Sequence, residues 1–351
     1  MFSCYHSLCS KYIRACGSTA FFAIQGIVNT SLVIGLNILF LKVFDFGITG
    51  YVLSVAIADL LSTLLIVVHD KLWRDITIKV DRVILKDLLR YSIPMIPATI
   101  FWWVTSVSNR YFVTFVFGEE ANGIYAVAYK IPTLLTLIST VFMQAWQFSA
   151  VLESENDREA HIDFFSKVWG SFQSVMFLVG GFVTALSVPL IKILTTKAFY
   201  GASMYVPMLT AAMVFSAFAN FMGSVYVVEK RSKNSFLTTM VGAVATLVLT
   251  FVLIKTPLGV QGAAIATFVS YLLVFVIRAV NASKYIPFKL YWVNVILNTA
   301  IIILQTVFMV MGLPFNYPVQ AVCVILLGLV NFKFIKVFIV KMLSLVKGKI
   351  K

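Results

Sequence analysis

The chain has 351 residues, of which 60% are hydrophobic and only 12% are charged. A typical soluble domain carries about 25% charged residues, so this composition excludes a soluble globular protein. The net charge of +14 would suit nucleic-acid binding in a soluble protein, but in a membrane protein basic residues gather in cytoplasmic loops.

Apolar stretches long enough to cross a bilayer recur along the whole chain. A spanning helix needs about 20 mostly apolar residues. Ten stretches meet this length: 20–41, 48–68, 93–117, 123–148, 168–188, 204–228, 235–254, 260–280, 291–313 and 318–340. The first lacks the small-residue cleavage pattern of a signal peptide. The sequence therefore predicts an all-α polytopic membrane protein with about ten transmembrane helices.

Basic residues alternate along the connections between these stretches. When the connections are assigned to the two sides in turn, starting inside, 22 of the 28 basic residues fall inside and 4 outside. The inside set includes residues 69–92, with six basic residues, and residues 278–290, with three. This bias predicts that both termini are cytoplasmic. Because the charge follows membrane topology, we expect no nucleic-acid partner.

The longest inside connection, residues 69–92, combines charge with helical periodicity. After Asp81, which suits an N-cap, apolar residues such as Val83 and Leu88 recur on one face. This pattern predicts an amphipathic helix at the cytoplasmic membrane surface. A solvated linker helix fits the same pattern.

Residues 47–56 and 259–267 form similar hairpins, each with a G-x-x-G turn followed by an Ala- and Ser-rich span. If this is a true repeat and not a chance likeness of turns, its offset is 212 residues. A matching first lobe would then begin about 120 residues before Met1. We therefore predict the end of a first lobe (1–68), a linker (69–92), a six-helix second lobe (93–281) and two extra helices with a basic tail (282–351).

Three ionisable side chains fall within the apolar spans. Each of Asp59, Arg110 and Lys130 would cost roughly 2.5–3.5 kcal/mol facing lipid, so we expect them to face protein or a water-filled cavity. Arg110 and Lys130 lie on consecutive spans at a similar depth, which predicts a site for an anion such as phosphate or pyrophosphate. Alternatively, Arg110 pairs with Asp59, or with Glu119 and Glu120 at the outer mouth.

Asp59 is a candidate for coupling transport to protons or sodium, although a lone acid is also a common salt-bridge partner. Near the two cations, polar and aromatic residues such as Asn109 and Tyr129 suit a sugar ligand. The same residue types also hold membrane helices together.

Signatures of catalysis or cofactor binding are not found in the sequence. His6 with Cys4 and Cys9 lacks a fourth metal ligand at suitable spacing, and no phosphate-binding loop of an ATPase occurs. We therefore predict no enzyme activity, no metal and no cofactor.

Four segments carry a family resemblance: YIRA (12–15), LLRYSIPMIP (88–97), NRY (109–111) and GIYAVAYKIP (123–132). In this order they resemble the bacterial polysaccharide flippases, which export lipid-linked O-antigen or teichoic-acid units. These flippases are part of the multidrug/oligosaccharidyl-lipid/polysaccharide exporter superfamily. The resemblance implies two six-helix lobes in a V, with a cationic central cavity and alternating access. Family members usually begin with four more helices, so the resemblance describes a chain that is short at its N-terminus.

The resemblance also implies a function and a place in the cell. The substrate would be an undecaprenyl-pyrophosphate-linked oligosaccharide, flipped across the bacterial inner membrane for lipopolysaccharide O-antigen or similar polymers. The partners would be membrane lipids and other polysaccharide assembly proteins. Arg110 and Lys130 match the family's cavity cations by residue type and approximate place. The alternatives are a drug or ion exporter of the same superfamily, a membrane polysaccharide polymerase or acyltransferase, and a nonfunctional truncated flippase.

Overall fold

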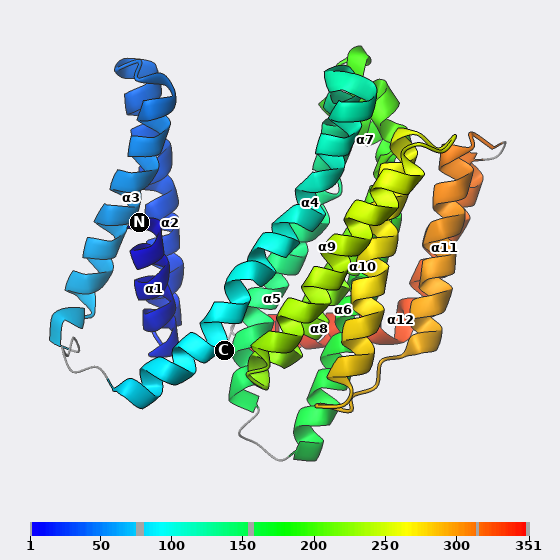
Figure 1. Ribbon diagram of the computed structural model, residues 1–351. Coiled ribbons are helices and arrows are strands. Elements are labelled where there is room, and N and C mark those ends of the chain that lie inside the picture. Colours follow the sequence, from blue (N-terminus) through cyan, green and yellow to red (C-terminus); the bar gives the residue numbers. More distant parts are fainter. Residues whose placement is uncertain (1, 75–80, 154–157, 314–315, 349–351) are drawn as a thin grey trace. The chain divides into compact units, whose positions relative to one another are not determined.

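A computed structural model describes residues 2–74, 81–153, 158–313 and 316–348 (Figure 1). All regular elements in these ranges are helical, which confirms the expected all-α polytopic membrane fold. Within the same ranges, eight helices are long and apolar enough to cross a membrane, or nine if a bent pair counts as one span. This count treats Arg82–Lys130 as one helix, although it is broken at Gly118, whereas the sequence divides the same residues between two of its ten predicted spans.

The helices fall into two compact units, residues Met1–Leu85 and Lys86–Lys351. In the first unit, α1 (Phe2–Ala15) and α2 (Thr19–Asn37) both pack on α3 (Gly47–His69). A short π-helix, Ile38–Val43, leads from α2 into the turn before α3. The small apolar core of this unit centres on Ile13, Ile66 and Leu72.

Residues 82–130 form one long helix, α4 (Arg82–Lys130), that is broken at Gly118. Asp81 caps its start, because its Oδ1 accepts hydrogen bonds from the backbone N–H groups of Val83 (2.8 Å) and Ile84 (3.4 Å). The helix runs without a break from this cap through Pro94 and Pro97. The expected surface helix and the expected span 93–117 are therefore continuous. Residues 75–80 of the predicted linker lie outside the described residues.

The core of the second unit is built around α8 (Val206–Val228), which is buried on nearly all sides. Four helical segments precede it in the chain: α5 (Thr133–Glu153), α6 (Arg158–Ala185), α7 (Ser187–Leu194) and a 3-10 helix (Lys197–Met204). Aromatic rings from several helices meet around α8. Trp169 of α6, for example, lies 5.1 Å from both Phe218 and Phe221, measured between ring centroids. Contact area of this kind supplies packing energy between helices in a membrane.

The remaining helices pack around α8 and α6. They are α9 (Ser232–Leu253), α10 (Val260–Ala282), α11 (Trp292–Val310) and α12 (Asn316–Gly348). α10 packs on α8 and α9, whereas α11 and α12 pack on α6. The buried amides of Asn298 and Asn331 bond to each other at 2.8 and 3.1 Å and join α11 to α12. The two C-terminal helices are therefore part of the second unit.

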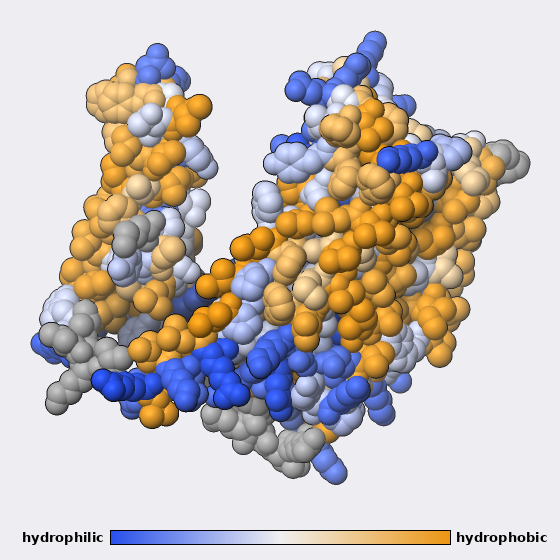
Figure 2. All heavy atoms as spheres, in the orientation of Figure 1, coloured by the Kyte–Doolittle hydropathy of each residue, from blue (hydrophilic) through white to orange (hydrophobic). Residues whose placement is uncertain are grey.

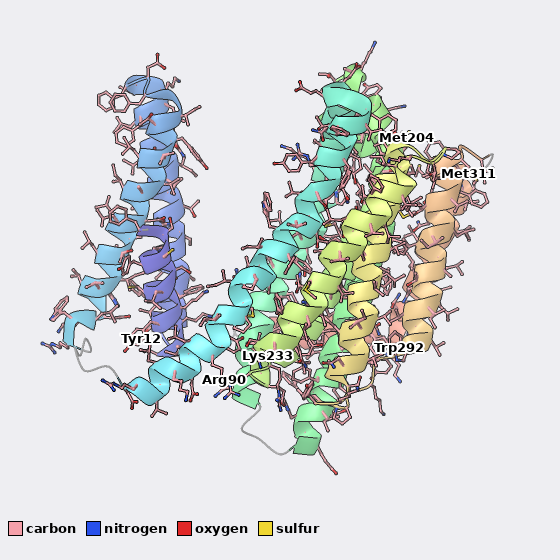
Figure 3. The ribbon with its side chains drawn as sticks, viewed as in Figure 1. Tyr12, Arg90, Met204, Lys233, Trp292 and Met311 are labelled. Carbon is pink, nitrogen blue, oxygen red and sulfur yellow. The ribbon has the colours of Figure 1, made fainter. Side chains whose placement is uncertain are left out.

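The two ends of the second unit differ in character. Figure 3 shows Arg90, Lys233 and Trp292 at one end, and Met204 and Met311 at the opposite end. In Figure 2, the visible face of this unit is mostly hydrophobic between the ends, and hydrophilic residues gather at the end that holds Arg90 and Lys233. Arg90 and Lys233, which come from two connections predicted to be on the inside, thus share one end of the unit.

Candidate functional site

The hairpin that carries the predicted cations is formed by two arms of α4, the helical segments before and after Gly118. Gly118 has φ 85° and ψ 178°, a backbone conformation that a residue with a side chain rarely adopts. The chain turns back at this residue, so that the Arg110 guanidinium lies within electrostatic range of the Tyr129 hydroxyl. The outside turn predicted over 118–122 is thus confined to one residue, since helix resumes at Glu119.

Both predicted cations are exposed and lack a carboxylate partner. Within the described ranges, neither the Arg110 guanidinium nor the Lys130 ammonium forms an ion pair. The alternative in which Glu119 and Glu120 neutralise Arg110 is not seen. Lys130 ends its helix just before Pro132, at a 41° bend between α4 and α5. Two accessible positive charges on one hairpin can bind an anion without first breaking a salt bridge.

Tyrosine rings line the hairpin beside these cations. The ring centroid of Tyr125 lies 6.2 Å from that of Tyr129 and 6.0 Å from that of Tyr205, at the start of α8. The hydroxyl group of Tyr129 is buried without a hydrogen-bond partner among the described residues. Tyr205 was not predicted as a neighbour of the hairpin, because no local sequence pattern relates a residue before α8 to residues 109–130.

The structure gives Asn109 a clear packing role. Its side chain is only 1% exposed. Its Nδ2 donates to Oγ1 of Thr267 on α10 at 2.5 Å, and its Oδ1 accepts from Oγ1 of Thr250 on α9 at 2.5 Å. Asn109 therefore joins the hairpin to two helices. Without Asn109, the residues left for the predicted anion site are Arg110, Lys130 and Tyr129.

Arg278 is a buried cation that the sequence analysis assigned to a loop. The sequence placed it in the connection 278–290, but α10 continues to Ala282 and Arg278 is 4% exposed. Its guanidinium donates to Thr238 (3.0 Å) and Thr239 (2.8 Å) on α9 and to the carbonyl oxygen of Ala219 (2.8 Å) on α8. A basic residue one turn from the end of an apolar span cannot be told from a loop residue by charge and hydropathy alone.

Trp102 connects this buried cation to the hairpin. Its ring centroid lies 5.9 Å from the central carbon of the Arg278 guanidinium and 5.4 Å from the ring centroid of Tyr271. An indole face over a guanidinium is a favourable cation–π arrangement. Arg278, Trp102 and Tyr271 thus form a continuous contact between α10 and the first arm of α4.

In the first unit, Asp59 is buried in a polar cluster. Its side chain accepts hydrogen bonds from the Ser3 hydroxyl and, at 3.3 Å, from the Asn29 side-chain amide. The His6 Nδ1 lies 3.7 Å from Asp59 Oδ1. The predicted ionisable residue of this span is therefore bonded within its own unit, and helices α1 and α2 supply its neighbours. The sequence analysis considered His6 only as a metal ligand.

The chain resembles known proteins both in sequence and in fold. A family profile described as polysaccharide biosynthesis protein matches residues 19–204, slightly more than half of the chain. No curated protein matches the sequence. Several solved structures resemble the fold.

An outward-facing multidrug resistance MATE family transporter of the MOP superfamily has a TM-score of 0.70, with 16% identity over 80% of this chain and 66% of that chain. A MATE structure in the straight conformation has a TM-score of 0.69 at the same identity and coverage. A MOP superfamily transporter from Pyrococcus furiosus Vc1, described as having a binding pocket of reverse polarity, has a TM-score of 0.60 at 15% identity, over 80% of this chain and 66% of that one. The chain shares this fold and spans about two thirds of the length of these proteins.

Proposed function

The chain belongs to the polysaccharide biosynthesis protein family, and from this premise we propose that it translocates lipid-linked oligosaccharides across a membrane. The observation that carries the proposal is the pair of exposed, unpaired cations on the α4 hairpin, Arg110 and Lys130. Both lie on one hairpin that packs into the second unit, and we propose that together they bind an anion at membrane depth.

The chemistry of this pair suits a pyrophosphate group. A guanidinium binds phosphate oxygens through two parallel N–H groups, and an ammonium adds a compact positive charge. The Tyr129 hydroxyl, which lacks a partner among the described residues, is a further donor beside Arg110. In this proposal the pyrophosphate of an undecaprenyl-linked oligosaccharide contacts Arg110 and Lys130. The sugars would contact the half-buried ring of Tyr129 beside Arg110.

We further propose that Asp59 binds the ion that drives transport. It is 6% exposed and lies near the middle of α3. An ionised carboxylate is energetically costly within a membrane, so an acidic residue at such a position usually has a function. The protein would reside in a bacterial inner membrane with both termini cytoplasmic. The clustering of Arg90 and Lys233 at one end of the second unit supports this orientation (Figure 3).

A drug or ion exporter of the same superfamily is the alternative suggested by the fold. Organic-cation export requires acidic groups at the binding surface, because the substrate is positive. The hairpin instead presents two cations, and this difference favours an anionic substrate.

The first test is complementation of a bacterium that lacks its O-unit flippase, with surface polysaccharide as the readout. The chain is expressed alone and also together with a four-helix N-terminal segment of a full-length flippase. In whichever background restores polymer, R110E and K130E are compared with K197E. Lys197 is an exposed cation in the 3-10 helix and is not among the residues proposed to bind the substrate, so K197E controls for a change in net charge.

We expect each hairpin reversal to lower surface polymer strongly while K197E leaves it near the wild-type level. Loss of one charge-assisted phosphate contact costs about 1.5–3 kcal/mol, which corresponds to roughly a tenfold to hundredfold loss of affinity. Normal polymer levels in R110E would refute the assigned role of Arg110. Failure of the wild-type chain in both backgrounds, despite correct membrane insertion, would refute the proposed function.

A further inference from the structure

Trp103, on the first arm of α4, fits neither of the usual roles of tryptophan in a membrane protein. Trp146 and Trp169 are buried in the helix core, and their indole N–H groups donate hydrogen bonds at 3.1 and 2.8 Å. Trp292 begins α11, at a span end, where exposed tryptophans usually gather. Trp103 is 56% exposed and yet lies well inside its span. Its exposure therefore needs another explanation.

The depth of Trp103 excludes an anchoring role at the membrane surface. At a rise of about 1.5 Å per residue, Trp103 lies about 20 Å from Arg90 and about 22 Å from the turn at Gly118. An exposed side chain at this depth contacts either lipid tails or a polar cavity. The indole N–H of Trp103 has no hydrogen-bond partner among the described residues. Because an unpaired N–H is costly in contact with hydrocarbon, this position favours a polar ligand.

Trp103 shares a face of α4 with the proposed anion-binding residue Arg110. Residues seven positions apart in a helix differ by about 20° around the axis and by about 10 Å along it. Thr99 and Ser106 fall on the same face, which we call the polar face and which comprises Thr99, Trp103, Ser106 and Arg110. Tyrosine 129 lies on the same side, since its hydroxyl is within electrostatic range of the Arg110 guanidinium.

A second exposed face of the same arm has a different composition. It is apolar, and we define it by Ile93, Ile100 and Phe115. This apolar face suits lipid tails, because none of its side chains carries a hydrogen-bonding group. Trp103 is therefore grouped by helix geometry with the hydroxyl and guanidinium side chains of the polar face.

Trp103 also follows the two cations in depth. Counted from Gly118 along the two arms, Arg110 lies about 12 Å, Lys130 about 18 Å and Trp103 about 22 Å toward the end that holds Arg90. A pyrophosphate bound by Arg110 and Lys130 would therefore have the indole of Trp103 as the next group on its inner side. The first sugar of a lipid-linked oligosaccharide is bonded directly to the pyrophosphate, so it occupies this level.

We propose that Trp103 is the stacking surface for the first sugar ring of the lipid-linked oligosaccharide. The inference rests on the proposed function, in which Arg110 and Lys130 bind the pyrophosphate. A pyranose ring has an apolar C–H face that packs on an indole, and a hydroxyl group at the ring edge accepts from the indole N–H. The proposal adds a sugar site to the anion site. It also orients the substrate, with the sugars on the inner side of the pyrophosphate.

The test compares two soluble probes of equal charge, one with a sugar and one without. They are farnesyl pyrophosphate-linked N-acetylglucosamine and the methyl ester of farnesyl pyrophosphate. Their affinities for the purified full chain in detergent are measured by isothermal titration calorimetry. The variants are W103A, W103F, R110Q and F115A. Phe115 is the matched control, because it is an exposed aromatic residue of the same arm but belongs to the apolar face.

We expect the wild type and F115A to bind the sugar-bearing probe about two- to tenfold more tightly than the methyl ester, as for one aromatic contact. W103A should bind both probes equally, and W103F should keep part of the preference. The methyl ester should bind W103A as tightly as the wild type, which also shows that the variant is folded. R110Q should weaken binding of both probes by a similar factor.

Two results of this titration would overturn the sugar site. The first is a full sugar preference in W103A. The second is equal binding of the two probes by the wild type, because stacking on the C–H face of a ring requires no particular pattern of hydroxyl groups. If the wild type binds neither probe, the pyrophosphate site of the proposed function fails as well.

A second measurement tests the surroundings of Trp103 without any ligand. In a chain whose four cysteines are replaced by alanine, W103C and I100C are placed in lipid nanodiscs and treated with a membrane-impermeant maleimide. W103C should react, and the sugar-bearing probe should protect it more than the methyl ester does. I100C, on the apolar face at a similar depth, should not react. An unreactive W103C would place this side chain against lipid and refute the sugar site.

Discussion

Replacing Asn109 with alanine removes both hydrogen bonds that join the first arm of the α4 hairpin to α9 and α10. In the structure these bonds to Thr250 and Thr267 measure 2.5 Å each and are fully buried. If Asn109 is a packing residue, N109A destabilises the fold. If Asn109 contacts substrate, the same change mainly affects transport.

The expected size of the effect follows from the two bonds. Hydrogen bonds between membrane helices contribute about 0.6 kcal/mol on average and at most about 1.7 kcal/mol each. Two bonds therefore give a loss of about 1–3 kcal/mol. Thr267 keeps its hydrogen bond to the carbonyl oxygen of Ala263 at 2.8 Å, so only Thr250 loses its recorded partner. The loss of stability caused by a buried hydroxyl without a partner is therefore limited to Thr250.

The assay is reversible unfolding of the purified protein in detergent, followed by tryptophan fluorescence. The matched control is S106A, on the same arm, because the Ser106 hydroxyl donates only to the carbonyl oxygen of Trp103 in its own helix. S106A should change the free energy of unfolding by less than about 0.5 kcal/mol. A double-mutant cycle of N109A with T250V should give a coupling energy of about 0.6–1.7 kcal/mol.

Two outcomes would refute this reasoning. A coupling energy of zero between Asn109 and Thr250 would mean that the bond contributes nothing to stability. Unchanged stability of N109A together with loss of surface polysaccharide would place Asn109 in contact with the substrate, as the sequence analysis first suggested.

Two further substitutions test the packing of α10. G262A should destabilise the fold by about 1–3 kcal/mol, since its new methyl group would lie 2.5 Å from the backbone oxygen of Leu253, whereas G328A, with open space around it, should be neutral or stabilising in the same unfolding assay. R278K should lower stability by about 1–3 kcal/mol, because one ammonium cannot span the hydroxyls on α9 and the carbonyl group on α8 that the guanidinium joins. An unfolding midpoint of R278K equal to that of the wild type would show that these three bonds do not hold the helices together.

The class of protein and the approximate course of the chain could be predicted from local sequence patterns. Runs of apolar residues predicted the membrane helices, because a bilayer span requires a fixed length of apolar helix whatever its neighbours are. The break at Gly118 and the cap at Asp81 were also readable, since a turn and a cap depend on a few adjacent residues. The family resemblance of the hairpin agrees with the family profile.

Which polar side chains meet could not be predicted from the sequence, because it depends on how the helices pack. In an apolar span nearly every face of the helix looks alike in sequence, so hydropathy does not reveal which way Asn109, Asp59 or Arg278 points. Asn109 bonds to residues 141 and 158 positions away in the chain, and Asp59 lies beside a histidine on a helix that precedes the first predicted span. Contacts of this kind depend on the rotation of each helix about its axis. Packing among several helices fixes that rotation, and no local stretch of sequence specifies it.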